Sequence, residues 1–149
     1  MRAVIQRVNT ASIKIKENVV ASIGRGIVVF LGIAKEDIAK DCFYLSEKII
    51  LLRLFPNDEN KMHFNIHDLK LPLLVVSQFT LLADCRQGRR PDFFSAAKPE
   101  KAKKLYELFI CDLKQKGVEV LSGVFKEYMQ VELVNDGPVT FLLDSKKQF

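Results

Sequence analysis

Histidine, cysteine and tryptophan are scarce in this chain of 149 residues, which has two histidines, three cysteines and no tryptophan. Cys42, Cys85 and Cys111 lie far apart and form no CxxC pair, which excludes a zinc ribbon and disfavours a disulfide scaffold. A metal site built from histidines would need both His63 and His67. If the chain is an enzyme, it has few of the histidine and cysteine side chains that enzymes commonly use in catalysis.

Long hydrophobic runs are also absent. The longest, residues 27–34, has about 8 residues, whereas a membrane-spanning helix needs roughly 20. Apolar and polar residues alternate from Ala3 onward, so the start of the chain lacks the unbroken apolar stretch of a signal peptide. We therefore expect a soluble, cytoplasmic protein that does not associate with a membrane.

The length and the charge set broad limits on the partner. We expect residues 1–149 to form a single domain, in which residues 145–149 are a short polar tail. Hydrophobic residues make up 48% of the chain, which is enough for a sizeable core. The net charge of +5 suits an anionic partner, but it is also an ordinary charge for a soluble protein.

Hydrophobic periodicity predicts strands, a helix, a strand, a second helix and further strands. The first helix is expected from an N-cap at Asp37 and to end before Pro56, and the second from near Pro99 to Gly117. The predicted strands cover residues 2–8, 11–17, 19–23, 27–33, 73–82, 118–121, 129–134 and 138–143. This order favours an α+β fold, with a mostly antiparallel, barrel-like sheet and two packed helices.

The segment Ser77-Gln78-Phe79-Thr80-Leu81 follows an apolar strand and carries three polar side chains. One interpretation is that the strand has reached the surface and its hydroxyl groups are bonded locally. The other is a pocket floor, where Ser77 or Thr80 would be a nucleophile or backbone N–H groups would polarise a carbonyl.

Basic residues cluster in Arg86-Gln87-Gly88-Arg89-Arg90-Pro91, and Lys98, Lys101, Lys103 and Lys104 follow. Arginine side chains bind phosphates in a bidentate manner, so this cluster could hold an RNA backbone. A solvated basic loop and helix face would have the same sequence.

A third segment, Asn135-Asp136-Gly137-Pro138-Val139-Thr140, lies between two predicted strands. Its Gly-Pro pair is typical of a turn.

Three weaker candidates remain. His63 and His67 have the i, i+4 spacing of a helical metal site, but a helix is poorly supported there. Cys85 lies beside Arg86, whose charge would favour a thiolate, although no histidine partner is evident. We interpret Phe93 and Phe94 as core residues or pocket walls rather than as stacking platforms.

Together these segments resemble the D-aminoacyl-tRNA deacylase family, also called D-tyrosyl-tRNA deacylase. The resemblance is carried by MRAVIQRV at the start, LLVVSQFTL at residues 73–81, GRRPDF at 88–93 and NDGPVT at 135–140. It covers nearly the whole chain. Two positions depart from the usual GKMN segment of the family, since Asn60 replaces its glycine and His63 its asparagine. The glycine expected after Phe125 is also missing.

The resemblance implies an enzyme that hydrolyses the ester between a D-amino acid and the terminal adenosine of tRNA. It implies that L-aminoacyl-tRNA is rejected and that glycine mischarged onto tRNA is also a substrate. It further implies a homodimer with its active sites at the interface, no metal and no organic cofactor.

The resemblance also assigns roles to residues. Ser77, Gln78, Phe79 and Thr80 would form the catalytic segment, in which the backbone N–H groups of Phe79 and Thr80 are candidates to hold the ester carbonyl. Gly137 and Pro138, joined by a cis peptide bond, would enter the partner's active site and exclude an L side chain. The residues expected to support the pocket are Arg7, Met129, Asn135 and Val139. The residues expected to contact tRNA are Lys61, Arg86, Arg89 and Arg90.

The chemistry leaves two routes open. Thr80 has been regarded in the family as a nucleophile, but no base is evident for it, so we favour attack by water helped by the ribose 2′-OH of the substrate. Two other readings compete with this one: a noncatalytic RNA-binding module, and a hydrolase that uses the Cys85 thiol.

Overall fold

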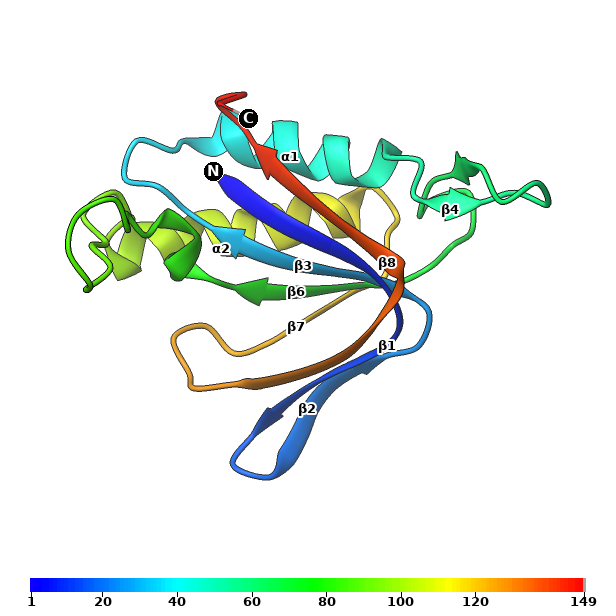
Figure 1. The fold of residues 1–149 in the computed structure, drawn as a ribbon, viewed down its shortest axis with the longest axis horizontal. Helices are drawn as coiled ribbons and strands as arrows, with labels where there is room; N and C mark the ends of the chain where they lie inside the picture. Colours follow the sequence, from blue (N-terminus) through cyan, green and yellow to red (C-terminus); the bar gives the residue numbers. More distant parts are fainter. Residues whose placement is uncertain (149) are drawn as a thin grey trace.

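The long first strand organises the sheet of this computed structural model, which describes residues 1–148 (Figure 1). The N-terminal half of β1 (Arg2–Ile15) pairs antiparallel with β3 (Gly26–Gly32), and its C-terminal half pairs antiparallel with β2 (Asn18–Ile23). Along its other edge β1 pairs antiparallel with β8 (Gln130–Asp144) over most of its length. One bent strand therefore connects the two halves of a curled sheet.

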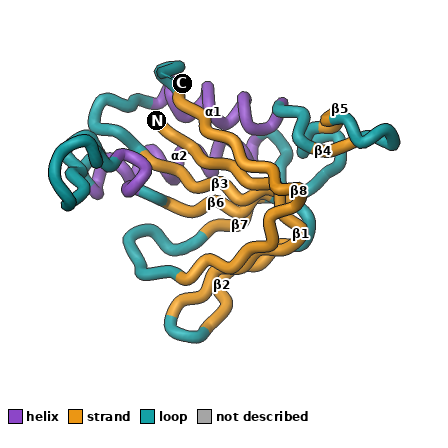
Figure 2. The backbone as a smooth tube through the Cα atoms, in the orientation of Figure 1, coloured by secondary structure: helices purple, strands orange, loops and turns teal. Residues whose placement is uncertain are grey.

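Two parallel pairings extend the sheet beyond β3. β6 (Leu73–Ser77) pairs with β3, and β7 (Val120–Ser122) pairs with β6. A separate small hairpin, β4 (Phe55–Pro56) and β5 (Met62–Phe64), projects from the end of the molecule where β1 and β8 bend (Figure 2). The predicted α+β class, with a mostly antiparallel, barrel-like sheet and two helices, is confirmed.

Both long helices cover the same face of the sheet, and the C-terminal end of β8 reaches the neighbourhood of the first of them (Figure 1). α1 (Ala39–Leu51) and α2 (Pro99–Gln115) pack against each other as well as against the strands. Pro99 at the first turn of α2 and Gly117, with φ of +80°, mark the two ends predicted from the sequence.

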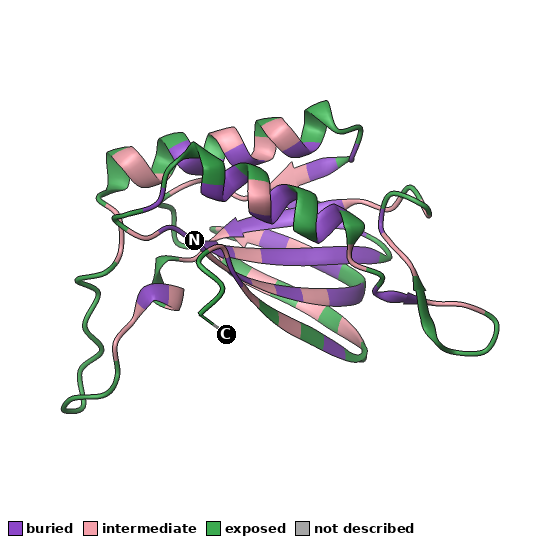
Figure 3. Cartoon of the chain, turned by 90° about the horizontal axis from the view of Figure 1, so that it is seen from above, coloured by how far each residue is buried: buried purple, intermediate pink, exposed green. Residues whose placement is uncertain are grey.

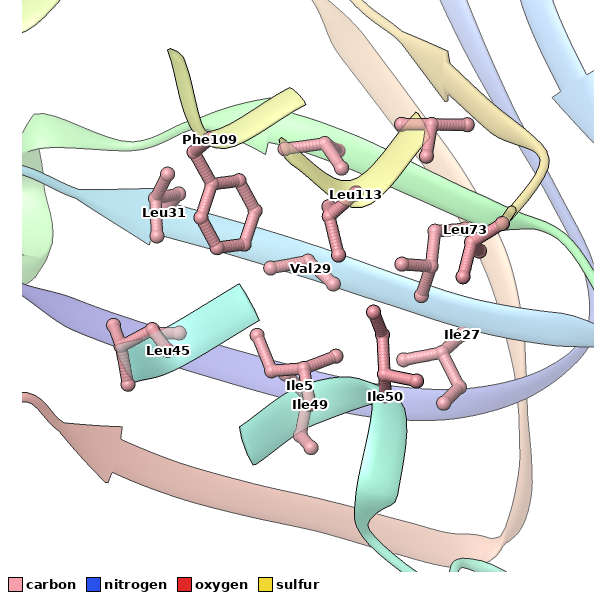
Figure 4. Close-up of a cluster of buried hydrophobic side chains, with 14 of the residues drawn as sticks. Ile5, Ile27, Val29, Leu31, Leu45, Ile49, Ile50, Leu73, Phe109 and Leu113 are labelled. Atoms are coloured by element: carbon pink, nitrogen blue, oxygen red, sulfur yellow. The ribbon is translucent and has the colours of Figure 1, made fainter. Parts of the chain in front are cut away.

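The main core lies between these helices and the sheet. Figure 4 shows Leu45 and Ile49 of α1 and Phe109 of α2 directed toward β1, β3 and β6, and all three are fully buried. A second, smaller core fills the concave side of the sheet, because alternate strand residues face opposite sides, as Val28 and Val29 do. The alternation of buried and exposed segments along the strands is visible in Figure 3.

Asp37 is not the N-cap of the first helix, contrary to the sequence prediction. Its carboxylate is fully buried, where it accepts from the Met1 ammonium at 2.6 Å and from the Ala34 N–H at 2.7 Å. The helix begins at Ala39, and the carboxylate of Asp41 accepts from the Ile38 N–H at 2.9 Å instead. A buried carboxylate needs a charged partner, and the amino terminus, brought close by β1, supplies one.

Asp41 is held ionised beside this pair. Burial raises the pKa of its carboxyl group, but hydrogen bonds from Lys146 and from the Ile38 N–H outweigh this effect and lower the pKa to about 2. The Lys146 ammonium lies 2.7 Å from the Asp41 carboxylate, so the residues after β8 are attached to α1 by an ion pair.

The strand predicted over residues 73–82 is shorter than expected. β6 ends at Ser77, and a 3-10 helix, η1 (Phe79–Leu82), follows it. Residues 2–8 and 11–15, predicted to belong to two strands, are instead parts of the continuous β1, which pairs with β8 in both halves, and residues 16–17 form a turn. Within residues 1–148, no helix combines the length and the apolar character needed to cross a membrane.

Candidate active site

A cavity of about 700 Å³ opens beside η1, at the end of the sheet where β3 and β6 finish. Its walls come from four parts of the chain: the ends of β3 and β6, η1, the start of α2, and the loop that leads into β8. Ser77, Gln78, Phe79 and Thr80 all line it. The structure thus brings the predicted catalytic segment to a cavity wall rather than to a flat surface.

The backbone at Gln78 is fixed to the neighbouring strand, since its N–H donates to the carbonyl of Leu31 at 2.8 Å. The side-chain amide of Gln78 donates to the Thr80 hydroxyl oxygen. Neither the nitrogen nor the oxygen of an amide group is a base at neutral pH, so this partner cannot take a proton from Thr80. The contact orients the Thr80 side chain without activating it as a nucleophile.

The backbone N–H groups of Phe79 and Thr80 lie at the beginning of η1. The first N–H groups of a helix have no acceptor within that helix, so they are available to a bound group. Two such donors on consecutive residues beside a cavity can hold a developing oxyanion, which is the geometry that acyl transfer requires.

The loop leading into β8 adds residues that the sequence did not single out. Lys126, Glu127 and Tyr128 line the cavity together with Met129, which was expected there. Lys126 has φ of +70°, in the left-handed region that favours glycine. Its position is where the glycine expected after Phe125 is missing, so this absence was the signal of an unusual backbone at the cavity.

The Asn135–Thr140 segment is not a turn between two strands, contrary to the sequence prediction. It is a bulge within β8, because Asn135 pairs with Val8 and Thr140 with Gln6 of the same partner strand. The extra residues leave the ladder at Gly137 and Pro138, which are exposed and joined by a cis peptide bond. A long, bent β1 that accepts both halves of β8 explains why the chain does not reverse here.

Side chains hold the two ends of this bulge. The Asn135 side chain accepts from the Val139 N–H at 2.7 Å and donates to the Thr140 hydroxyl at 3.0 Å. Arg7 is buried and donates from Nε to the Asp136 carbonyl at 3.2 Å, while its Nη1 donates to the Leu54 carbonyl at 2.5 Å. Its guanidinium also pairs with the Asp136 carboxylate at 2.9 Å. The backbone beside Gly137 is therefore fixed from both sides.

The bulge and the cavity lie at opposite ends of the sheet within one chain (Figure 1). Ser77 is aligned through Leu31 with Ala3, whereas Asn135 is aligned with Val8. The five residues from Ala3 to Val8 correspond to roughly 16 Å along an extended strand. The structure therefore does not bring Gly137 and Pro138 to the cavity of their own chain.

Two of the four residues predicted to contact tRNA form ion pairs with nearby carboxylates. Arg86 is bound by Asp84, with Nη2 2.6 Å from its carboxylate, and Lys61 lies 2.7 Å from Glu59. The hydrogen bonds from Arg86 hold the pKa of the Asp84 carboxyl well below its ordinary value. Among residues 1–148, no ion pair engages Arg89 or Arg90.

The remaining sequence candidates are not assembled into a site. His63 lies in β5 with its ring against Phe64, and His67 lies in a turn, so the pair does not share a helix face. Cys85 is exposed in the basic loop, where the neighbouring guanidinium is already bound by Asp84. No group of three or more potential metal ligands occurs in the described part of the chain.

Comparisons with known proteins match nearly the whole length of this chain to one family. Residues 4–144 match the family model described as D-Tyr-tRNA(Tyr) deacylase. A D-aminoacyl-tRNA deacylase of Thermotoga petrophila is 50% identical over 149 residues, and one of Petrotoga mobilis is 52% identical over 150 residues. In both comparisons the alignment covers all of this chain and all of the relative.

Two solved structures have the same fold. A structure titled c-Myc DNA Unwinding Element Binding Protein superposes with a TM-score of 0.91 at 38% identity, covering 97% of this chain and 98% of that one. A probable eukaryotic D-amino acid tRNA deacylase superposes with a TM-score of 0.85 at 15% identity, covering 95% and 97%, a likeness of fold alone.

Proposed function

The chain belongs to the D-Tyr-tRNA(Tyr) deacylase family, and from this premise we propose that it hydrolyses the ester between a D-amino acid and the terminal adenosine of tRNA. The observation that carries the proposal is the placement of residues 77–80 on one wall of the cavity, with two consecutive N–H donors at the start of η1. An ester hydrolase needs a carbonyl-binding site of this kind. The cytoplasm, where tRNAs are charged, is the proposed place of action.

Water is the proposed nucleophile. Its oxygen bonds to the ester carbonyl carbon, and the negative charge that develops on the carbonyl oxygen is held by the N–H groups of Phe79 and Thr80. The bond to the ribose oxygen then breaks, and the proton lost by the water passes to that leaving oxygen with the help of the neighbouring ribose hydroxyl. The products are the free D-amino acid and tRNA. The Gln78–Thr80 contact supports this route, because it leaves Thr80 without a base.

We propose a homodimer in which each cavity is completed by Gly137 and Pro138 of the other chain. Four features support this. The bulge is exposed, it is held by Arg7 and Asn135, and it lies too far along the sheet to reach its own cavity. The outer edge of β8 has no partner strand within the described residues, and Leu142 is exposed there, so this edge can face a second copy.

Selection of the D enantiomer follows from the same arrangement. Carbonyl oxygens of a fixed backbone can accept from the α-amino group of the substrate and occupy the space that an L side chain would need. Glycine has no side chain to be rejected, so glycine mischarged onto tRNA is also a proposed substrate. The site requires no fit to one particular D side chain.

The decisive experiment adds purified protein to D-Tyr-tRNA and, separately, to L-Tyr-tRNA and follows loss of the aminoacyl group. Hydrolysis of the D ester alone is expected. Binding of both tRNAs with hydrolysis of neither would instead favour a noncatalytic RNA-binding module. Alkylation of the exposed thiols is expected to leave the rate unchanged, and inactivation would favour catalysis by Cys85.

A further inference from the structure

Exposed phenylalanine side chains lie at the mouth of the cavity and in the segment that precedes its lining residues Ala96 and Ala97. Phe79 is 58% exposed and lines the cavity, and its ring contacts that of Phe93, with the ring centroids 4.9 Å apart. The next residue, Phe94, is 77% exposed. The interpretation of Phe93 and Phe94 as core residues or pocket walls is therefore wrong, since Phe93 is also exposed and neither residue lines the cavity. An exposed aromatic group beside a binding cavity points to an interaction surface.

The backbone that carries Phe94 is fixed at several points. Its N–H donates to the Asp92 carboxylate at 2.8 Å, and Asp84 and Asp92 exchange two backbone hydrogen bonds, of 2.7 and 2.9 Å. The N–H of Lys35 donates to the carbonyl of Ser95 at 3.0 Å, which attaches the segment to the chain that follows β3. The ring is thus presented by an ordered backbone, which limits the entropy lost when a ligand stacks on it.

Cationic side chains adjoin these phenylalanines, and one of them, Lys35, also lies 3.8 Å from the Glu36 carboxylate. The Lys35 ammonium lies 3.7 Å from the centroid of the Phe94 ring, within the range of a cation–π contact. The loop closed by Asp84 and Asp92 carries Arg89 and Arg90. Aromatic rings beside cations are the combination that binds single-stranded nucleic acid, since bases stack on the rings and phosphates pair with the cations.

We propose that Phe94, with Lys35 beside it, is a stacking platform for an unpaired nucleotide that precedes the terminal adenosine, and that Arg89 and Arg90 bind the phosphates of that strand. The inference rests on the proposed function, which puts the aminoacyl ester in the cavity. From there the unpaired 3′ strand of tRNA leaves across the contacting rings of Phe79 and Phe93 and reaches Phe94. The platform grips RNA without reading its sequence, because every base has a face that can stack.

The test measures binding of two hydrolysis-resistant probes by fluorescence anisotropy. The long probe is an RNA hairpin with an unpaired 3′ strand that ends in adenosine carrying D-tyrosine through an amide bond. The short probe is the same D-tyrosyl adenosine without upstream nucleotides. The variants are Phe94→Ala and Phe94→Tyr, and the matched control is Phe43→Ala, which removes an exposed phenylalanine from α1.

Phe94→Ala is expected to weaken binding of the long probe about tenfold or more and to leave the short probe unchanged. Phe94→Tyr should bind both probes as the wild type does, and so should Phe43→Ala. In wild-type protein, affinity for the long probe should fall steeply with salt, and less steeply once Arg89 and Arg90 are replaced by glutamine.

Three results for Phe94→Ala would refute the proposed stacking platform. The first is wild-type affinity for the long probe, and the second is an equal loss of affinity for both probes. The third is a change in oligomeric mass, which would assign Phe94 to an interface with a second copy. The binding assay needs no turnover, so it is separate from the proposed function. Failure of the wild type to hydrolyse D-Tyr-tRNA would refute that function, whereas a failed platform with intact hydrolysis would refute only this inference.

Discussion

Among single residues, Thr80 separates the two possible nucleophiles most directly. Thr80→Val keeps the size of the side chain and the backbone N–H but removes the hydroxyl. If water attacks, hydrolysis of D-Tyr-tRNA should fall by no more than about tenfold, because the hydroxyl only orients neighbouring groups. Single-turnover rates measure the effect. Near-complete inactivity of a folded variant that still binds the hydrolysis-resistant probe would assign the attack to Thr80.

Lys126 provides a test of backbone strain at the cavity. Its φ of +70° is costly for a residue with a Cβ atom, so Lys126→Gly should raise the free energy of unfolding by about 0.5–1 kcal/mol. Lys126→Ala is the matched control, because it removes the same side chain and keeps the strain. Urea denaturation measures both. Equal stabilities of the two variants would show that the backbone at this position is not strained.

Asn60 occupies a second position of this kind. It has φ of +60° and stands where the family usually has glycine. Asparagine enters the left-handed region more readily than most residues, so this departure costs less than the one at Lys126. The missing glycines indicated both positions in the sequence, but they could not show that Lys126 lines the cavity whereas Asn60 lies in the loop between β4 and β5.

At the scale of secondary-structure elements, η1 packs closely against the end of β3 because Gly32 has no side chain. A Cβ atom on Gly32 would lie 2.9 Å from the Gln78 carbonyl oxygen and 3.0 Å from the Leu81 Cβ atom. Gly32→Ala should therefore displace η1, lower the stability by about 1–3 kcal/mol and slow hydrolysis by at least about tenfold.

The control for this prediction is Gly24→Ala, because a Cβ atom on Gly24 would meet nothing within 4 Å. We expect it to leave the rate of D-Tyr-tRNA hydrolysis unchanged and to alter stability by less than about 1 kcal/mol. Thermal melts and rates taken well below the melting temperature separate the two effects. A Gly32→Ala protein with wild-type rates would show that the position of η1 does not matter for catalysis.

The elements differ in how far the sequence could define them. Both helices follow from regular apolar spacing, and the end of α2 follows from Gly117. The N-cap at Asp37 was wrong because the Met1 ammonium, 36 positions away, satisfies that carboxylate. The bulge at Gly137 was mistaken for a turn because strand pairing with β1 decides whether the chain reverses, and local sequence contains no record of that partner.

At the scale of the whole molecule, the cavity and the bulge can be brought together only by a second chain. The polar residues after a buried strand left both a surface position and a pocket floor open, and only the family resemblance assigned residues 77–80 to the active site. The distance of Gly137 from that wall follows from the strand register, which sequence periodicity alone does not define. The shared site stays a prediction, and it can be tested by mixing two defective chains.

One chain carries Gly32→Ala, which damages the cavity, and the other carries Gly137→Ala, which puts a Cβ atom 2.7 Å from Val139 Cγ2 at a φ of +129°. The first homodimer should be slow, and the second should lose its discrimination between D and L esters. After random exchange of subunits in an equimolar mixture, hydrolysis of L-Tyr-tRNA should fall to about half of its value before exchange while hydrolysis of D-Tyr-tRNA stays the same, because one site of each mixed dimer has neither lesion.

Rates on D-Tyr-tRNA and L-Tyr-tRNA, measured before and after exchange, check this result. Self-exchanged samples of each variant are the controls. If the mixture behaves as the average of its two parents, then Gly137 does not act across the dimer.

β8 carries Met129 and Val131 at or beside its start and Gly137 near its bend, so under the proposed dimer one strand contributes to two different active sites. The number of residues between Met129 and Gly137 then determines the distance between those two sites. A loop can absorb an inserted residue, but here a single insertion would turn every following side chain to the opposite face. We therefore expect substitutions in this interval to be tolerated better than an insertion or a deletion.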